Sequence, residues 1–103
     1  MNSVHVPTIS AGDVDHLVDQ GWRLLDVRTD EEWASGRIPG SVHIPMDQLL
    51  ARLDEVGDRV LCVCAVGGRS ARVTEYLVAH GREALNVDGG VHGWAAAGGP
   101  IEA

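Results

Sequence analysis

Short apolar runs alternate along the chain with segments in which apolar residues recur at helical spacing. The apolar runs predict strands, and the segments between them predict helices that each bury one face. We expect an extended start at 6–9 and strands at 22–27, 42–44, 60–63 and 84–87. We expect helices at 10–21, 29–36 and 46–53, a helix that carries Val73 and Leu77 and closes near Gly81, and a last one at 91–97.

Polar residues mark where two of these helices begin. Ser10 precedes Asp13 by three residues, and Thr29 precedes Glu32 by the same distance, which is the spacing of a capping box. The helix at 46–53 is indicated instead by an apolar stripe, formed by Met46, Leu49, Leu50 and Leu53.

The alternation of strands and helices favours an α/β fold. Right-handed crossovers would give a mostly parallel sheet with helices on both faces, and the unbroken apolar run at 60–63 suits a central strand. Glycines and prolines fall singly between the predicted elements, without a linker or an internal repeat. We therefore expect a single domain over residues 1–103.

Polar side chains follow three of the predicted strands, at the point where each strand ends. They are Asp26 with Arg28, Cys64, and Asp88. Ligands of open α/β sheets bind beyond the carboxyl ends of the strands, so this edge is the expected site.

The segment after the central strand carries the most specific chemistry. Cys64 is followed by Ala65, Val66, Gly67, Gly68 and Arg69, and then by Ser70 in the next helix. A short loop that closes into a helix directs backbone N–H groups inward and forms an anion cradle, and both glycines are expected to permit its tight backbone. A cysteine there should have a lowered pKa and act as a thiolate nucleophile. The alternative is that Cys64 is a small buried apolar residue.

Charge and composition argue against some classes of binding partner. The chain has 103 residues, 45% of them hydrophobic and 22% charged, and a net charge of −7. This balance argues against nucleic acid or an anionic membrane as partner, and any anionic substrate must be attracted locally. No apolar run is long enough to span a bilayer, and the first ten residues lack the pattern of a signal peptide. Cys62 and Cys64 are poorly placed for a disulfide, which favours a reduced, cytoplasmic protein. The five histidines have no spacing that suggests a metal site.

Four motifs occur in order along the chain: Asp26-Val27-Arg28; residues 31–40 with Ile44-Pro45; residues 64–70; and residues 88–90 with Gly93-Trp94. Together they resemble the rhodanese family of sulfurtransferases over nearly the whole chain. The resemblance implies a five-stranded parallel sheet flanked by helices, with Cys64 as the residue that carries a persulfide. Arg37 and Trp33 depart from the family pattern, which most often has His and Phe there.

The resemblance implies transfer of a sulfane sulfur from thiosulfate or a persulfide to cyanide, a thiol or a protein cysteine, without a cofactor or metal. Arg69 either faces the substrate or pairs with a carboxylate such as Asp26, and we favour the pairing. Arg28 has the same two alternatives, and the structural one is a solvated salt bridge. Cys62 is expected to pack in the core. Because Ala65 and Val66 carry no charge, the loop does not indicate which sulfur donor the protein uses.

Two other functions use the same features. Cysteine phosphatases and arsenate reductases resemble a pattern with five residues between cysteine and arginine, whereas four separate Cys64 from Arg69. The shorter loop suits a single sulfur atom better than a phosphate. A non-catalytic interaction module typically resembles the family without the cysteine, which this chain retains.

Overall fold

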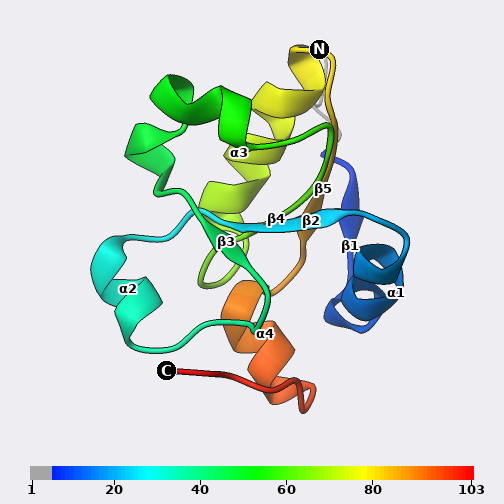
Figure 1. Ribbon diagram of the computed structural model, residues 1–103. Helices are drawn as coiled ribbons and strands as arrows, with labels where there is room; N and C mark the ends of the chain where they lie inside the picture. Colours follow the sequence, from blue (N-terminus) through cyan, green and yellow to red (C-terminus); the bar gives the residue numbers. More distant parts are fainter. Residues whose placement is uncertain (1–5) are drawn as a thin grey trace.

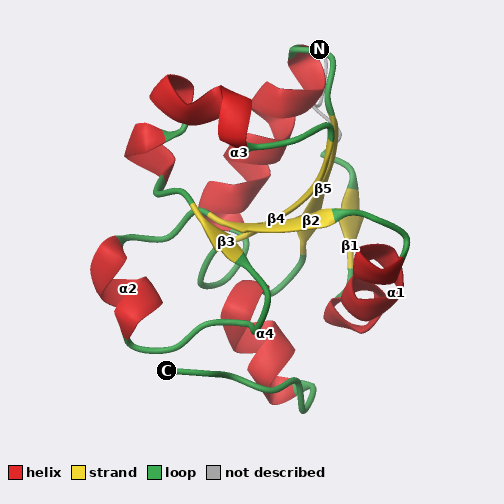
Figure 2. Cartoon of the chain, in the orientation of Figure 1, coloured by secondary structure: helices red, strands yellow, loops and turns green. Residues whose placement is uncertain are grey.

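The computed structural model describes residues 6–103 as a five-stranded sheet with helices on both faces (Figures 1 and 2). The strand order is β1-β5-β4-β2-β3, and every neighbouring pair is parallel. The predicted α/β fold with a mostly parallel sheet is therefore confirmed. The strands are β1 (Thr8–Ile9), β2 (Arg23–Asp26), β3 (Val42–His43), β4 (Arg59–Val63) and β5 (Glu83–Val87).

The helices follow the strands closely in sequence. They are α1 (Val14–Asp19), α2 (Asp30–Ala34), α3 (Gly68–Ala79) and α4 (Gly90–Ala96). Three short 3₁₀ helices accompany them, η1 (Ala11–Asp13), η2 (Met46–Gln48) and η3 (Leu50–Glu55). Within residues 6–103, none of these helices has the length and apolar character needed to cross a membrane.

The central strand β4 contributes side chains to two separate hydrophobic cores, because its side chains alternate between the two faces of the sheet. Val60 and Cys62 lie in one core with residues of α3, while Leu61 and Val63 lie in the other with residues of α1 and α4. All four side chains are fully buried. This strand is central, as predicted, and its carboxyl end is covered from both sides.

The apolar stripe at 46–53 does not form the α-helix that its spacing predicts. Residues 46–55 form η2 and η3 instead, and Arg52 is non-helical, with φ −124° and ψ 27°. A 3₁₀ helix has about three residues per turn, so side chains spaced for about 3.6 do not stay on one face. Leu49 is accordingly buried, whereas Leu50 is 66% exposed.

The capping box predicted at the start of α2 is present. The N–H of Glu32 donates to Thr29 Oγ1 at 3.2 Å, and the N–H of Thr29 donates to Glu32 Oε1 at 3.1 Å. These reciprocal bonds satisfy backbone donors that the helix leaves free, and they fix the position of the Glu32 side chain.

Candidate active site

Cys64 lies immediately after β4, in the loop that leads into α3. Its side chain is buried, and its Sγ accepts a hydrogen bond from the N–H of Gly67 at 3.1 Å. The Ser70 hydroxyl lies 3.3 Å from the same sulfur. The loop therefore closes around Sγ and directs donors at it, the arrangement expected of an anion cradle.

The two cysteines have opposite ionisation properties. Burial raises the pKa of Cys64, but hydrogen bonds from the Ser70 hydroxyl and from the N–H groups of Ser70, Gly67 and Val66 outweigh burial and lower the pKa below its usual value. Burial raises the pKa of Cys62 to about 11. Because only a thiolate is strongly nucleophilic, Cys64 is the candidate nucleophile and Cys62 is a core residue.

One of the two loop glycines is required by the backbone. Gly67 has φ +110°, in the left-handed region that favours glycine, whereas the φ of Gly68 is not positive and a Cβ there would meet nothing within 4 Å. The expectation that both glycines permit the tight turn is thus wrong for Gly68, which begins α3 in ordinary helical geometry.

The start of α4 holds the same loop from the other side. The N–H of Val91 donates to the carbonyl of Cys64 at 2.8 Å, and the N–H of His92 donates to the carbonyl of Ala65 at 3.1 Å. Gly90 lies so close to these carbonyls that a Cβ would overlap them. With its carbonyls held outward by α4, the loop is free to turn its N–H groups toward Sγ.

Arg69 pairs with a carboxylate, but the carboxylate is that of Glu32 and not of Asp26. Its guanidinium donates to Glu32 Oε1 at 2.7 Å and to Oε2 at 2.8 Å, which links α3 to α2. The Arg69 bond, opposed by some burial, lowers the pKa of Glu32 to about 2, and Glu32 in turn raises the pKa of Arg69. The sequence placed Glu32 in the capping box and in the motif at 31–40, but did not indicate it as the partner of Arg69. The capping box fixes the carboxylate that Arg69 meets.

Asp26 pairs instead with Arg28. Arg28 Nη2 donates to Asp26 Oδ2 at 2.8 Å, and the two side chains are 5% and 0% exposed. Arg28 also donates to the carbonyls of Gly36 at 2.7 Å and Glu32 at 3.2 Å. Of the two alternatives for Arg28, the salt bridge is present but is buried and not solvated. This pair holds the segment around α2 against the end of β2.

Asn86 of β5 belongs to the cradle, although sequence reasoning missed it. Its Oδ1 accepts a hydrogen bond from the Ser70 hydroxyl at 2.6 Å, and its Nδ2 donates to the carbonyl of Gly67 at 3.3 Å. The signal was a polar residue inside a strand predicted to be apolar. Asp88, which did seem to mark this edge, is exposed, and its N–H donates to Ile9 of β1.

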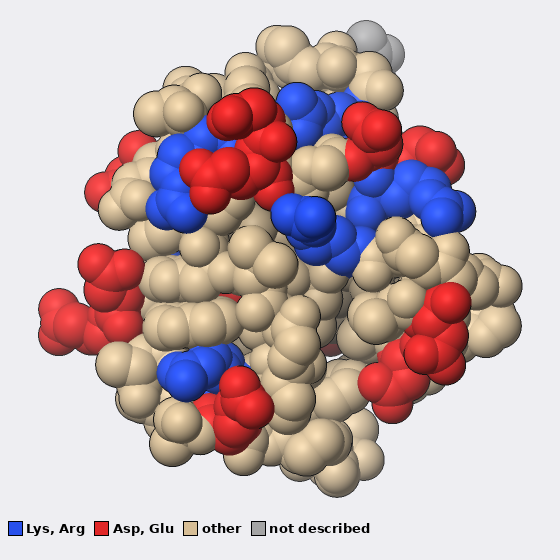
Figure 3. Space-filling view, viewed as in Figure 1, with Lys and Arg blue, Asp and Glu red and all other residues tan. Residues whose placement is uncertain are grey.

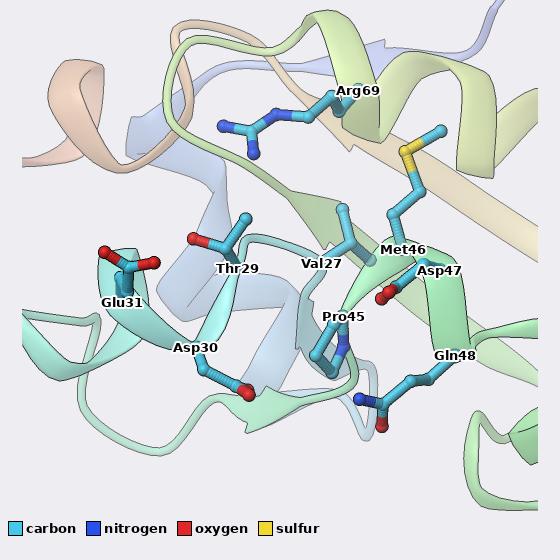
Figure 4. A pocket seen from close by; sticks show the side chains of 9 residues that line it. All are labelled: Val27, Thr29, Asp30, Glu31, Pro45, Met46, Asp47, Gln48 and Arg69. Carbon is cyan, nitrogen blue, oxygen red and sulfur yellow. The ribbon is translucent and has the colours of Figure 1, made fainter.

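A pocket of about 360 Å³ opens between α2, the η2 segment and Arg69 (Figure 4). Cys64 does not line it, but Arg69 does, and Cys64 is one of the groups that raise the pKa of Arg69 after Glu32. The lining includes the acidic side chains of Asp30, Glu31 and Asp47. Figure 3 shows acidic groups spread over this face of the molecule, with arginines between them.

Within residues 6–103, no three His, Cys, Asp or Glu side chains gather closely enough to hold a metal ion.

The sequence that forms this site matches a known protein family. Residues 10–97 match the family model described as the rhodanese-like domain. The chain belongs to the rhodanese-like family. The rhodanese-like chain is 40% identical over 83 residues to a sulfurtransferase of Allochromatium vinosum, covering 78% of each protein. It is 37% identical over 78 residues to the putative sulfurtransferase YtwF of Bacillus subtilis, covering 74% of this chain and 76% of the relative.

Solved structures show the same fold. The rhodanese-like domain protein of Staphylococcus aureus is 38% identical, with a TM-score of 0.81, and the match covers 95% of this chain and 100% of that one. The rhodanese-like domain also matches part of a longer chain, the reduced CoADR-RHD of Bacillus anthracis. There the identity is 36% and the TM-score 0.82, covering 87% of this chain and 16% of the other.

Proposed function

We propose that this protein is a sulfurtransferase that carries a sulfane sulfur on Cys64. The observation that carries the proposal is the placement of Cys64 Sγ 3.1 Å from the Gly67 N–H, inside a loop whose donors lower the pKa of the thiol. Family membership and relatives named sulfurtransferase support the same reaction class.

The first half-reaction loads the cysteine. The Cys64 thiolate attacks the outer sulfur of the donor, and a new S–S bond forms as the bond from that sulfur to the rest of the donor breaks. The leaving group, sulfite from thiosulfate or a thiolate from a persulfide, departs with the electron pair of the broken bond. The N–H groups of the loop then stabilise the negative charge on the terminal sulfur.

The second half-reaction returns the enzyme to its starting state. A nucleophilic acceptor, such as cyanide, a small thiol or a protein cysteine, attacks the terminal sulfur of the persulfide. The Sγ–S bond breaks and its electron pair stays on Cys64 as thiolate. The same cradle holds negative charge before and after each transfer, first on Sγ and then on the terminal sulfur.

The two arginines beside the site are already paired with carboxylates. Arg69 is bound by Glu32, Arg28 is bound by Asp26, and Val66 at the tip of the loop is apolar and 65% exposed. A dianion such as thiosulfate therefore meets neither of these arginines as a free charge, in a protein whose net charge is −7. We propose that a small or protein-bound persulfide is the better donor.

Intact-mass measurement after incubation with thiosulfate, or with a small persulfide, tests the proposed function. We expect a gain of one sulfur atom, reversed by cyanide or by a thiol. Cys64→Ser should abolish the gain, and Cys62→Ser is the matched control that should retain most of it. Equal loss from both substitutions would refute the assignment of Cys64.

Assay of an aryl phosphate separates the main rival. The loop has four residues between Cys64 and Arg69, so we expect no useful phosphatase activity. Substantial hydrolysis that disappears in Cys64→Ser would instead assign the site to phosphate chemistry.

A further inference from the structure

The Ser70 hydroxyl lies near two hydrogen-bond acceptors but has only one proton to donate. Its Oγ lies 2.6 Å from Asn86 Oδ1 and 3.3 Å from Cys64 Sγ. A serine hydroxyl has a single O–H donor, so a full hydrogen bond to one acceptor is made at the expense of the other. The two acceptors therefore compete.

The Asn86 amide is fixed in the orientation that makes it an acceptor for Ser70. Asn86 is 6% exposed, and its Nδ2 donates to the carbonyl of Gly67 at 3.3 Å. Turning the amide over would place its oxygen against the Gly67 carbonyl oxygen and its NH₂ group against the Ser70 hydroxyl. The backbone is also held, because the N–H of Asn86 donates to Pro7 at 2.8 Å.

The hydrogen bonds that this network can make differ between the thiol and the thiolate states of Cys64. In the thiol state, the S–H donates to Ser70 Oγ and the Ser70 hydroxyl donates to Asn86, so each group has a partner. In the thiolate state, Sγ requires a donor, and the hydroxyl can serve it only by leaving Asn86 Oδ1 without a proton. A buried acceptor left unpaired is costly.

We propose that Asn86 is a positioning residue that competes with the Cys64 thiolate for the proton of Ser70 and so limits how readily the cysteine ionises. When Sγ carries a second sulfur it is neutral, and the hydroxyl is free to return to Asn86. That last statement rests on the proposed function, whereas the competition in the unloaded protein does not.

Asn86 and Ser70 are uncharged, so the charged and titratable groups around Cys64 are other residues. From α3, Arg69 is bound to Glu32 of α2, and its pKa is raised by Glu32 and, to a smaller extent, by Cys64. From β4, Cys62 is a neutral thiol because its pKa is about 11. Beyond β5, Asp88 and the α4 residue His92 are exposed. Substitution of Asn86 leaves all of these charges in place but also removes the bond from Nδ2 to the Gly67 carbonyl. Only the part of the change in the pKa of Cys64 that disappears without Ser70 therefore reports on the hydroxyl.

The test is the pH profile of Cys64 alkylation by iodoacetamide in the unloaded protein, with the modified cysteine identified by peptide mass. Asn86→Val removes the competing acceptor and should lower the pKa of Cys64 by about one pH unit, the equivalent of one hydrogen bond. Ser70→Ala removes the contested donor and should raise that pKa. The double variant should match Ser70→Ala, because without the hydroxyl Asn86 has nothing to compete for.

Two results would overturn the proposal: a pKa that is unchanged or raised in Asn86→Val, or an equal shift from Asn86→Val with and without Ser70. Should Asn86→Val fail to fold, Asn86→Ala removes the same acceptor without a branched side chain and carries the same expectation. The measurement needs no sulfur donor, so its failure would leave the proposed sulfur transfer standing, and a failure to load sulfur would leave this result standing.

Discussion

The N–H of Val91 donates to the carbonyl of Cys64 at 2.8 Å, so the peptide that follows the candidate nucleophile is held by the first turn of α4. Gly90 permits this approach, since it has φ +59° and lies directly against the Cys64 and Ala65 carbonyls. The Gly89-Gly90 pair at the start of α4 therefore acts on the loop as well as on its own turn.

Gly90→Ala should destabilise the protein and disrupt the loop. The new Cβ would overlap the Cys64 and Ala65 carbonyl groups and would also be strained by the positive φ. The strain alone costs about 1–2 kcal/mol, and the overlap adds to it. Gly40→Ala is the matched control, because Gly40 has φ +82° but no atom within 4 Å of the new Cβ. Urea unfolding should show a clearly larger loss for Gly90→Ala, and similar losses would show that the loop contact is unimportant.

The two loop glycines should respond in opposite ways to alanine. Gly67→Ala places a Cβ at φ +110°, which should cost about 1 kcal/mol or more and impair sulfur loading. Gly68→Ala adds a Cβ in open space at the start of α3 and should be neutral or stabilising by up to about 1 kcal/mol. Thermal unfolding together with mass measurement of loading checks both, and equal effects would contradict the turn geometry.

Alkylation should distinguish the two cysteines at neutral pH. The donors in the loop lower the pKa of Cys64, whereas burial raises that of Cys62 to about 11. With limiting iodoacetamide, we expect modification at Cys64 in the folded protein and at both cysteines after denaturation in urea. Peptide mapping would show the result. Prior modification of Cys62 in the folded protein would contradict the assignment.

The Glu32–Arg69 pair should contribute stability that is lost in acid. Arg69 lowers the pKa of Glu32 from 4.5 to about 2. The contribution is therefore fully present above the unfolded value and declines as the pH falls from about 4.5 toward 2. Both side chains are partly exposed, so its size is roughly 1 kcal/mol. The difference in unfolding free energy between the native protein and Glu32→Gln should shrink between about pH 6 and pH 3. A constant difference would exclude a charge effect.

Thiosulfate should load Cys64 with a high KM. One charge-assisted contact contributes roughly 1.5–3 kcal/mol, or about one to two orders of magnitude, and the apolar loop residue Ala65 supplies none. Ala65→Arg should therefore lower the KM for thiosulfate and leave the transfer from persulfide to cyanide nearly unchanged. Ala65→Gln is a neutral control of similar length. Saturation of the native protein at micromolar thiosulfate would show that another group supplies the charge.

The sequence predicts the sheet and the position of Cys64 because both depend on local patterns. The apolar run at 60–63 forms β4, and the turn after it presents the cysteine. The partner of Arg69 was not predictable, because Arg69 and Glu32 are 37 residues apart and meet only in the folded chain. Asn86 was missed for the same reason, since its contact with Ser70 crosses from β5 to α3.

The dependence of the loop on residues far along the chain has a consequence for biosynthesis. Cys64 and Ala65 are synthesised well before Asn86, Val91 and His92, which hold the loop and its serine in place. Until that later segment leaves the ribosome and docks, the nascent chain carries Cys64 as an ordinary thiol without an assembled cradle. We therefore expect the lowered pKa of Cys64 to develop fully only when the fold is complete.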